Sequence, residues 1–113
     1  TRDKEFLENL ISLIEDNLTL PEMDIEFLCT QAGMSRTKLY NKIKSITGQS
    51  IGDFIRTIRL RKAATLMSES DLSLTDIMYS VGIQTQSYFS KAFKQEFGKT
   101  PTQFLKEIEA KNK

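Results

Sequence analysis

An internal repeat constrains this chain more than any other feature of its sequence. Matched positions lie 49 residues apart up to a glycine in each unit and 50 residues apart beyond it, so the second unit has one extra residue after that glycine. The matched pairs are Leu28 and Ile77, Gly33 and Gly82, Ser35 and Thr85, Leu39 and Phe89, Ile43 and Phe93, Gly48 and Gly98, and Phe54 and Phe104. A repeat of this period indicates two copies of one supersecondary unit.

The chain is predicted to be all-α, because apolar residues recur at spacings of three and four and no run alternates apolar with polar. Ser and Thr residues in N-cap positions and glycines in stop positions set the expected ends, with Ser73 and Thr75 as alternative caps for one short helix. Pro21 is expected to mark the exit of the first helix. The seven predicted helices are about 3–17, 24–32, 36–47 and 51–68, one from Ser73 or Thr75 to Val81, 86–97, and one from Pro101 onward.

Each repeated unit consists of a short helix, a glycine turn and a capped second helix, which is the pattern of a helix-turn-helix. We therefore expect one domain, residues 1–113, with two helix-turn-helix subdomains joined by a long linker helix. The first unit covers about 24–48, the linker helix about 51–68 and the second unit about 74–98.

The composition disfavours an enzyme. The chain of 113 residues contains no histidine, so the commonest general base and the commonest metal ligand are missing, and no metal or cofactor is expected. Cys29 is the only cysteine, which excludes an intrachain disulfide and fits a reducing cytoplasm. No apolar run approaches the roughly 20 residues that span a bilayer, so this segment is not expected to contact a membrane.

The charge distribution favours a nucleic-acid partner although the net charge is only +1. Residues 1–33 carry two basic and eight acidic side chains, whereas residues 34–62 carry eight basic and one acidic. Residues 83–99 are again net positive, with three basic side chains and one acidic. A single charged run is most often a solvated surface, but here both positive segments fall on the repeated unit, which favours a shared binding role.

The outward sides of the two second helices are polar to basic and contain no Asp or Glu. Such amide, hydroxyl and cationic groups can read base edges in the major groove. Ser35 and Thr85 are predicted to cap their helices and also to contact phosphate. The outward residues are Thr37, Asn41 and Lys44 with Lys38 beside them, and, at the matching positions, Ser87, Lys91 and Lys94. Lys44 and Lys94 are expected to bind phosphates rather than bases.

Several basic and aromatic residues allow two interpretations. Arg56, Arg59 and Arg61 cannot all point one way, so we expect at least one to pair with an acidic neighbour and one to face DNA. Tyr40 and Tyr88 flank the outward sides, where packing and base contact are equally compatible with the pattern.

The strings MSRTKLYNKIKSITGQS, FIRTIRLRKAA and SYFSKAFKQEFGKTP resemble the AraC/XylS-type DNA-binding domain over about residues 6–106. The first unit is especially similar to C-terminal domains of hybrid two-component regulators. The resemblance implies a sequence-specific double-stranded DNA-binding domain of a bacterial transcription regulator, with two recognition helices in successive major grooves. By the same resemblance the base-reading residues are Arg36, Thr37 and Asn41 in the first unit and Gln86, Ser87 and Lys91 in the second.

The resemblance also implies partners outside this segment. We expect a cytoplasmic segment cut from a longer chain, because no sensor or receiver domain fits into it and its first residue is Thr1. The sensor and receiver domains of that chain are expected partners, and RNA polymerase is a further candidate. Two alternatives stay open: a helical protein-interaction module, whose binding would be insensitive to salt, and a small enzyme.

Overall fold

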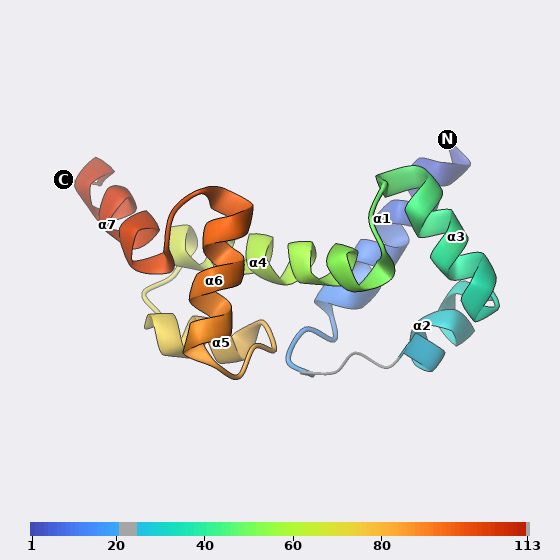
Figure 1. The fold of residues 1–113 in the computed structure, drawn as a ribbon, viewed down its shortest axis with the longest axis horizontal. Coiled ribbons are helices and arrows are strands. Elements are labelled where there is room, and N and C mark those ends of the chain that lie inside the picture. Colours follow the sequence, from blue (N-terminus) through green and yellow to red (C-terminus); the bar gives the residue numbers. More distant parts are fainter. Residues whose placement is uncertain (21–24, 113) are drawn as a thin grey trace.

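The computed structural model describes residues 1–20 and 25–112. All regular structure within these residues is helical, which confirms the all-α prediction (Figure 1). The molecule is elongated, with extents of 47 × 28 × 21 Å. The seven helices are α1 (Arg2–Glu15), α2 (Ile25–Ala32), α3 (Arg36–Thr47), α4 (Ile51–Glu69), α5 (Leu74–Ser80), α6 (Gln86–Phe97) and α7 (Pro101–Lys111).

The predicted helix ends agree closely with the structure. Helices α3 and α6 have the predicted bounds, because a Ser or Thr begins each one and a glycine ends it with positive φ, 75° at Gly48 and 77° at Gly98. Between the two alternative caps of α5, the structure selects Ser73, whose hydroxyl accepts a bond from the Asp76 amide at 3.1 Å. The predictions for Pro21 and for a helix start at residue 24 fall outside the described residues.

Thr85 corrects one prediction. It occupies the N-cap position of α6, but its side chain makes no capping hydrogen bond. Its backbone, with φ −125° and ψ 137°, differs from the φ −69° and ψ 162° of Ser35, whose hydroxyl does accept from the Lys38 amide at 3.3 Å. Without this bond, the expected capping stabilisation of about 1 kcal/mol is absent at Thr85.

Two separate hydrophobic cores share α4. The first contains Phe54 and Ile58 from the N-terminal half of α4, together with buried side chains from α1, α2 and α3. The second contains Ala63 and Met67 from the C-terminal half, together with buried side chains from α5 and α6 and partly buried ones from α7. Each core therefore has a different half of the same helix as one wall, which explains why α4 is apolar on more than one side.

Arg59 lies between the two cores. Among the residues that the structure describes, it is the only charged one that is buried. Its Nη1 donates to the carbonyl oxygens of Leu18 and Val81, both at 2.6 Å, and its Nη2 donates to the carbonyl oxygen of Leu20 at 2.8 Å. Burial lowers the pKa of the guanidinium, which these carbonyl dipoles solvate in place of water. Arg59 thus ties the segment after α1 to the turn of the second helix-turn-helix.

Gly82, in that turn, provides the space for this connection. A Cβ atom at residue 82 would collide with the Arg59 guanidinium and with the Leu18 carbonyl oxygen. Its φ of +81° also lies in the left-handed region. Two separate constraints therefore favour glycine at residue 82: the backbone conformation of the turn and the close approach of the two units.

Candidate nucleic-acid interface

All the residues predicted to contact DNA are exposed to solvent. The opposite sides of the same helices are buried, with Leu39 and Ile43 of α3 in the first core and Phe89 and Phe93 of α6 in the second. Core packing therefore fixes which side of each helix faces outward. The exposed residues are Ser35, Arg36, Thr37, Lys38, Asn41 and Lys44 in the first unit, and Thr85, Gln86, Ser87, Lys91 and Lys94 in the second.

The exposed faces of α3 and α6 lie near opposite ends of α4. Helix α3 lies beside the N-terminal end of α4, whereas α6 crosses its C-terminal half (Figure 1). The 19 residues of α4 span about 28 Å at 1.5 Å per residue. Because α4 is one uninterrupted helix and Arg59 joins the units across it, the spacing between α3 and α6 is set by rigid elements.

The first side chain of each exposed helix contacts the preceding helix. The Arg36 guanidinium forms an ion pair with the Glu26 carboxylate on α2, with an Nη2 to Oε1 distance of 3.1 Å. The Gln86 amide donates to the Thr75 hydroxyl on α5 at 3.3 Å. Sequence reasoning missed both partners, although the repeat offsets of 49 and 50 relate Glu26 to Thr75 and Arg36 to Gln86.

Three of the predicted phosphate ligands, Lys44, Lys94 and Ser35, occupy helix ends. Lys44 donates from Nζ to the Gly48 carbonyl oxygen at 3.0 Å, at the end of α3 where a cation interacts favourably with the helix dipole. Lys94 occupies the matching last turn of α6. Ser35 combines its capping bond with an exposed position at the start of α3. Both lysine residues remain exposed at the surface.

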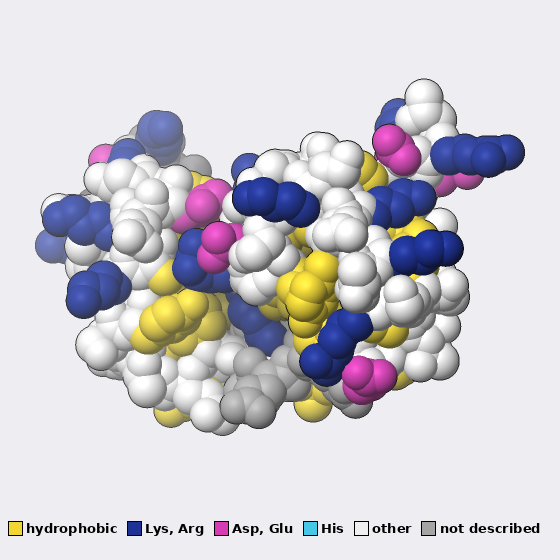
Figure 2. All heavy atoms as spheres, turned by 45° about the vertical axis from the view of Figure 1, so that its right-hand side comes forward, with side chains coloured by type: hydrophobic (Ala, Val, Ile, Leu, Met, Phe, Trp, Pro, Cys, Tyr) yellow, Lys and Arg dark blue, Asp and Glu magenta, His cyan; other side chains and the backbone are white. Residues whose placement is uncertain are grey.

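Several other basic side chains in residues 34–62 have partners within the protein. Arg56 pairs with Asp53 at 3.1 Å, which confirms that at least one of the three arginines has an acidic neighbour. Arg59 is buried and cannot face a ligand. Figure 2 accordingly shows Lys and Arg side chains scattered over one face, several with acidic side chains nearby, rather than merged into one patch. The remaining pairings are Arg61 with Glu96, 3.9 Å apart, and Lys42 over the Phe6 ring, 4.5 Å from its centroid.

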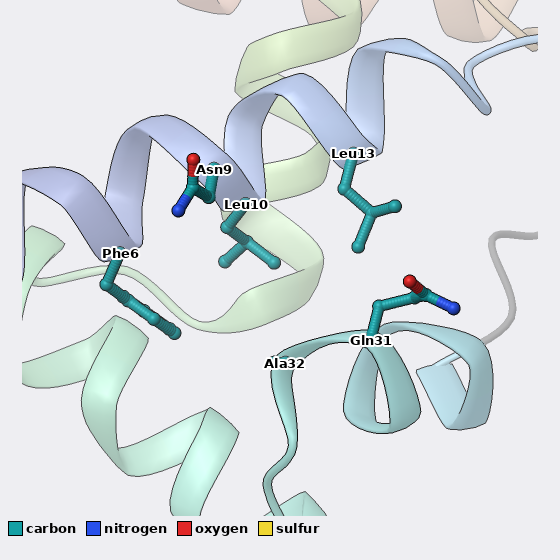
Figure 3. A pocket seen from close by; sticks show the side chains of 6 residues that line it. All are labelled: Phe6, Asn9, Leu10, Leu13, Gln31 and Ala32. Carbon is teal, nitrogen blue, oxygen red and sulfur yellow. The ribbon is translucent and has the colours of Figure 1, made fainter.

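Two hollows differ in their relation to these faces. One, of about 580 Å³, lies along α6 and is bordered by Tyr88, Lys91 and Lys94, so it belongs to the outward side of that helix. Another, of about 300 Å³, lies between α1 and α2, where Phe6, Leu10 and Leu13 form an apolar wall (Figure 3). None of the residues predicted to contact DNA lines this second hollow.

The described part of the chain holds no group of three His, Cys, Asp or Glu residues that could bind a metal ion. Among its helices, none has the length and apolar character needed to cross a bilayer.

Comparison with known proteins connects these observations to a family. The family model for the helix-turn-helix domain matches residues 28–107. Histidine kinase P4 of Formosa agariphila is 36% identical over 102 residues, which cover 90% of this chain but only 7% of the kinase. This chain therefore corresponds to a small part of that relative.

Two solved structures have the same fold. The C-terminal domain of AraT, a response regulator from Geobacillus stearothermophilus, is 28% identical with a TM-score of 0.79, and the match covers 95% of this chain and 88% of that domain. The DNA-binding domain of AdpA, a global transcriptional factor in complex with a target DNA, is 23% identical with a TM-score of 0.79, covering 93% and 94% of the two chains. With a family match over most of its length and a helix-turn-helix at each end of α4, this chain belongs to the helix-turn-helix domain family of the AraC/XylS type.

Proposed function

We propose that this chain is a sequence-specific double-stranded DNA-binding domain of a bacterial transcription regulator, which inserts α3 and α6 into successive major grooves. The observation that carries this proposal is the pair of exposed, repeat-related helix faces free of acidic residues. The second helix of a helix-turn-helix enters the major groove with its N-terminal residues at base edges. The shared fold with AdpA, solved in complex with a target DNA, supports the same role.

The exposed residues divide into two roles along each helix. We assign base reading in one box to Arg36, Thr37 and Asn41, which lie in the first half of α3. The matching residues Gln86, Ser87 and Lys91 are assigned to the other box. Phosphate contacts, which position the protein without carrying sequence information, are assigned to Ser35, Lys38, Lys44, Thr85 and Lys94.

The two boxes should be unlike and their spacing strict. Successive major-groove faces on one side of DNA lie about 34 Å apart, close to the length of about 28 Å of α4. Bending of the DNA, at a cost of a few kcal/mol, can accommodate the difference between these two lengths. Because α3 and α6 carry different side chains, one monomer of residues 1–113 should bind an asymmetric site rather than a palindrome.

Partners beyond DNA are proposed as well. A match to 7% of a histidine kinase and to the C-terminal domain of a response regulator supports sensor and receiver domains elsewhere in a longer cytoplasmic or membrane-anchored regulator. RNA polymerase is the proposed partner for control of transcription. The chain is proposed to act by binding and not by catalysis, without a metal or cofactor.

Spacing experiments test the proposal. Duplexes selected from a random pool would be redesigned with about 5 or about 10 base pairs inserted between the boxes. A half-turn insert is expected to reduce affinity to that of a single box, and a full-turn insert is not expected to restore it, because α4 cannot lengthen. Full recovery with the longer insert would show a flexible connection, and two proteins on one minimal site would show that a dimer spans it.

The salt dependence of affinity separates DNA binding from the protein-interaction alternative. Each phosphate contact contributes a slope of about −0.9 to the log–log plot of the binding constant against salt. Affinity that does not change between low and physiological salt would contradict the proposal.

A further inference from the structure

In both units, the first side chain of the recognition helix is held by the second residue of the preceding helix. Glu26 follows the first residue of α2 and contacts Arg36 at 3.1 Å, and Thr75 follows the first residue of α5 and contacts Gln86 at 3.3 Å. Both pairs occupy equivalent repeat positions. The chain thus repeats the contact but changes its chemistry, from an ion pair to a neutral hydrogen bond.

Each contact leaves a complete base-reading edge available. A guanidinium has five N–H donors in one plane, so Arg36 can bind Glu26 and still donate two parallel bonds to O6 and N7 of guanine. The Gln86 amide has two N–H donors and one acceptor. One N–H donates to Thr75. The other N–H can then donate to N7 of adenine while the amide oxygen accepts from the N6 amino group.

Folding stability does not explain the first pair. The Arg36 and Glu26 side chains are 57% and 72% exposed, and ion pairs between side chains this exposed contribute little to stability. A long side chain that is already oriented, however, loses less rotamer freedom when it binds. A contact of this kind can therefore contribute to recognition even where it adds little to the stability of the fold.

We propose that Glu26 and Thr75 are positioning residues for base recognition, which orient Arg36 to read guanine and Gln86 to read adenine. This inference rests on the proposed function, in which Arg36 and Gln86 face bases. It extends the interface from the recognition helices to the helices that precede them.

The test of Glu26 measures base preference rather than affinity alone. Duplexes selected with the wild-type chain would be varied through all four base pairs at each position of the first box. Glu26→Ala is expected to lower the preference at one base pair about 2- to 10-fold, the range that corresponds to ordering one flexible side chain. Glu8→Ala, which removes a similarly exposed carboxylate from α1 (64% exposed against 72% for Glu26), is the matched control and should leave every preference unchanged. Thermal melting would show that both variants fold.

Further variants of the same pair make the test specific. Arg36→Ala should abolish the preference at the same base pair, and adding Glu26→Ala to it should change nothing more. Exchanging the first pair for the second, with Glu26→Thr and Arg36→Gln together, should shift the preference from guanine to adenine.

The outcomes separate this inference from the proposed function. If Arg36→Ala alters one base preference and Glu26→Ala does not, base reading by Arg36 stands and the positioning role is wrong. If Glu26→Ala tightens binding to every sequence with a steeper salt dependence and an unchanged preference, Glu26 sequesters Arg36 instead of orienting it. If Arg36→Ala weakens all sequences equally, Arg36 contacts phosphate and both assignments fail.

Discussion

Replacing Arg59 with methionine tests whether the joint between the two units contributes to stability. The substitution keeps an unbranched apolar stem but removes three charge-assisted hydrogen bonds, to the carbonyl oxygens of Leu18, Leu20 and Val81. At about 1.5–3 kcal/mol each, these bonds contribute roughly 5–9 kcal/mol. The cost of burying the guanidinium, several kcal/mol, offsets part of this. We expect the free energy of unfolding to fall by about 3 kcal/mol.

Urea unfolding followed by circular dichroism measures this change. With a slope of about 1.5 kcal/mol per molar urea, the midpoint should fall by about 2 M. Arg56→Met is the matched control on the same helix, since the Arg56 side chain is 41% exposed and its ion pair with Asp53 lies at the surface. Its expected loss is below about 1 kcal/mol. Arg59→Lys keeps the charge but not the planar fork of donors, so it should fall between the two.

Similar midpoint shifts for Arg59→Met and Arg56→Met would refute this reasoning, because they would show that the buried hydrogen bonds contribute no more than an exposed ion pair. Should Arg59→Met fail to fold, Arg59→Lys still provides the comparison. A wild-type midpoint for Arg59→Lys would mean that the geometry of the three bonds is unimportant.

Two further predictions concern the turns and the interface. Gly82→Ala should destabilise the chain by at least about 3 kcal/mol, because a Cβ there meets Arg59 and the φ is +81°. Gly33→Ala, with φ +66° and nothing within 4 Å of the added Cβ, should cost only about 1–2 kcal/mol. Urea midpoints measure both losses, and equal values would contradict the steric argument. Asn41→Ala should change the base preference, because an amide can pair with adenine and contributes roughly 1–3 kcal/mol of discrimination. Lys44→Ala should instead weaken binding to every sequence, because a phosphate contact carries no sequence information. Affinities for a panel of single-base variants measure both effects, and a uniform effect of Asn41→Ala would show that the reading face is misplaced.

The sequence predicted the local structure well, because caps and glycine stops act over a few residues. Helices α3 and α6 were therefore predicted to the residue. The exposure of the predicted contact residues was predictable for a similar reason, since the apolar positions of each helix determine its inward side.

The long-range contacts were not predictable. Arg59 binds backbone carbonyl oxygens 41 and 22 residues away, and every residue type has such an oxygen, so its partners leave no trace in the sequence. The missing cap at Thr85 depends on a rotation of the backbone that residue type does not determine. The pairing of Glu26 with Arg36 was accessible in principle, because the repeat offers the parallel pair Thr75 and Gln86, but a single charged pair on a surface carries little information.

The sharing of α4 between two cores has a consequence for how this chain can be divided. Although there are two recognition surfaces, neither is an independent unit, because cutting α4 would expose apolar side chains on both sides of the cut. Loss of packing in either core removes support from the helix that forms one wall of the other. Backbone amides in the middle of α4, around 58–63, should therefore exchange with solvent only when the whole chain unfolds. A fragment carrying one recognition helix without all of α4 would be expected to aggregate rather than to bind a single box.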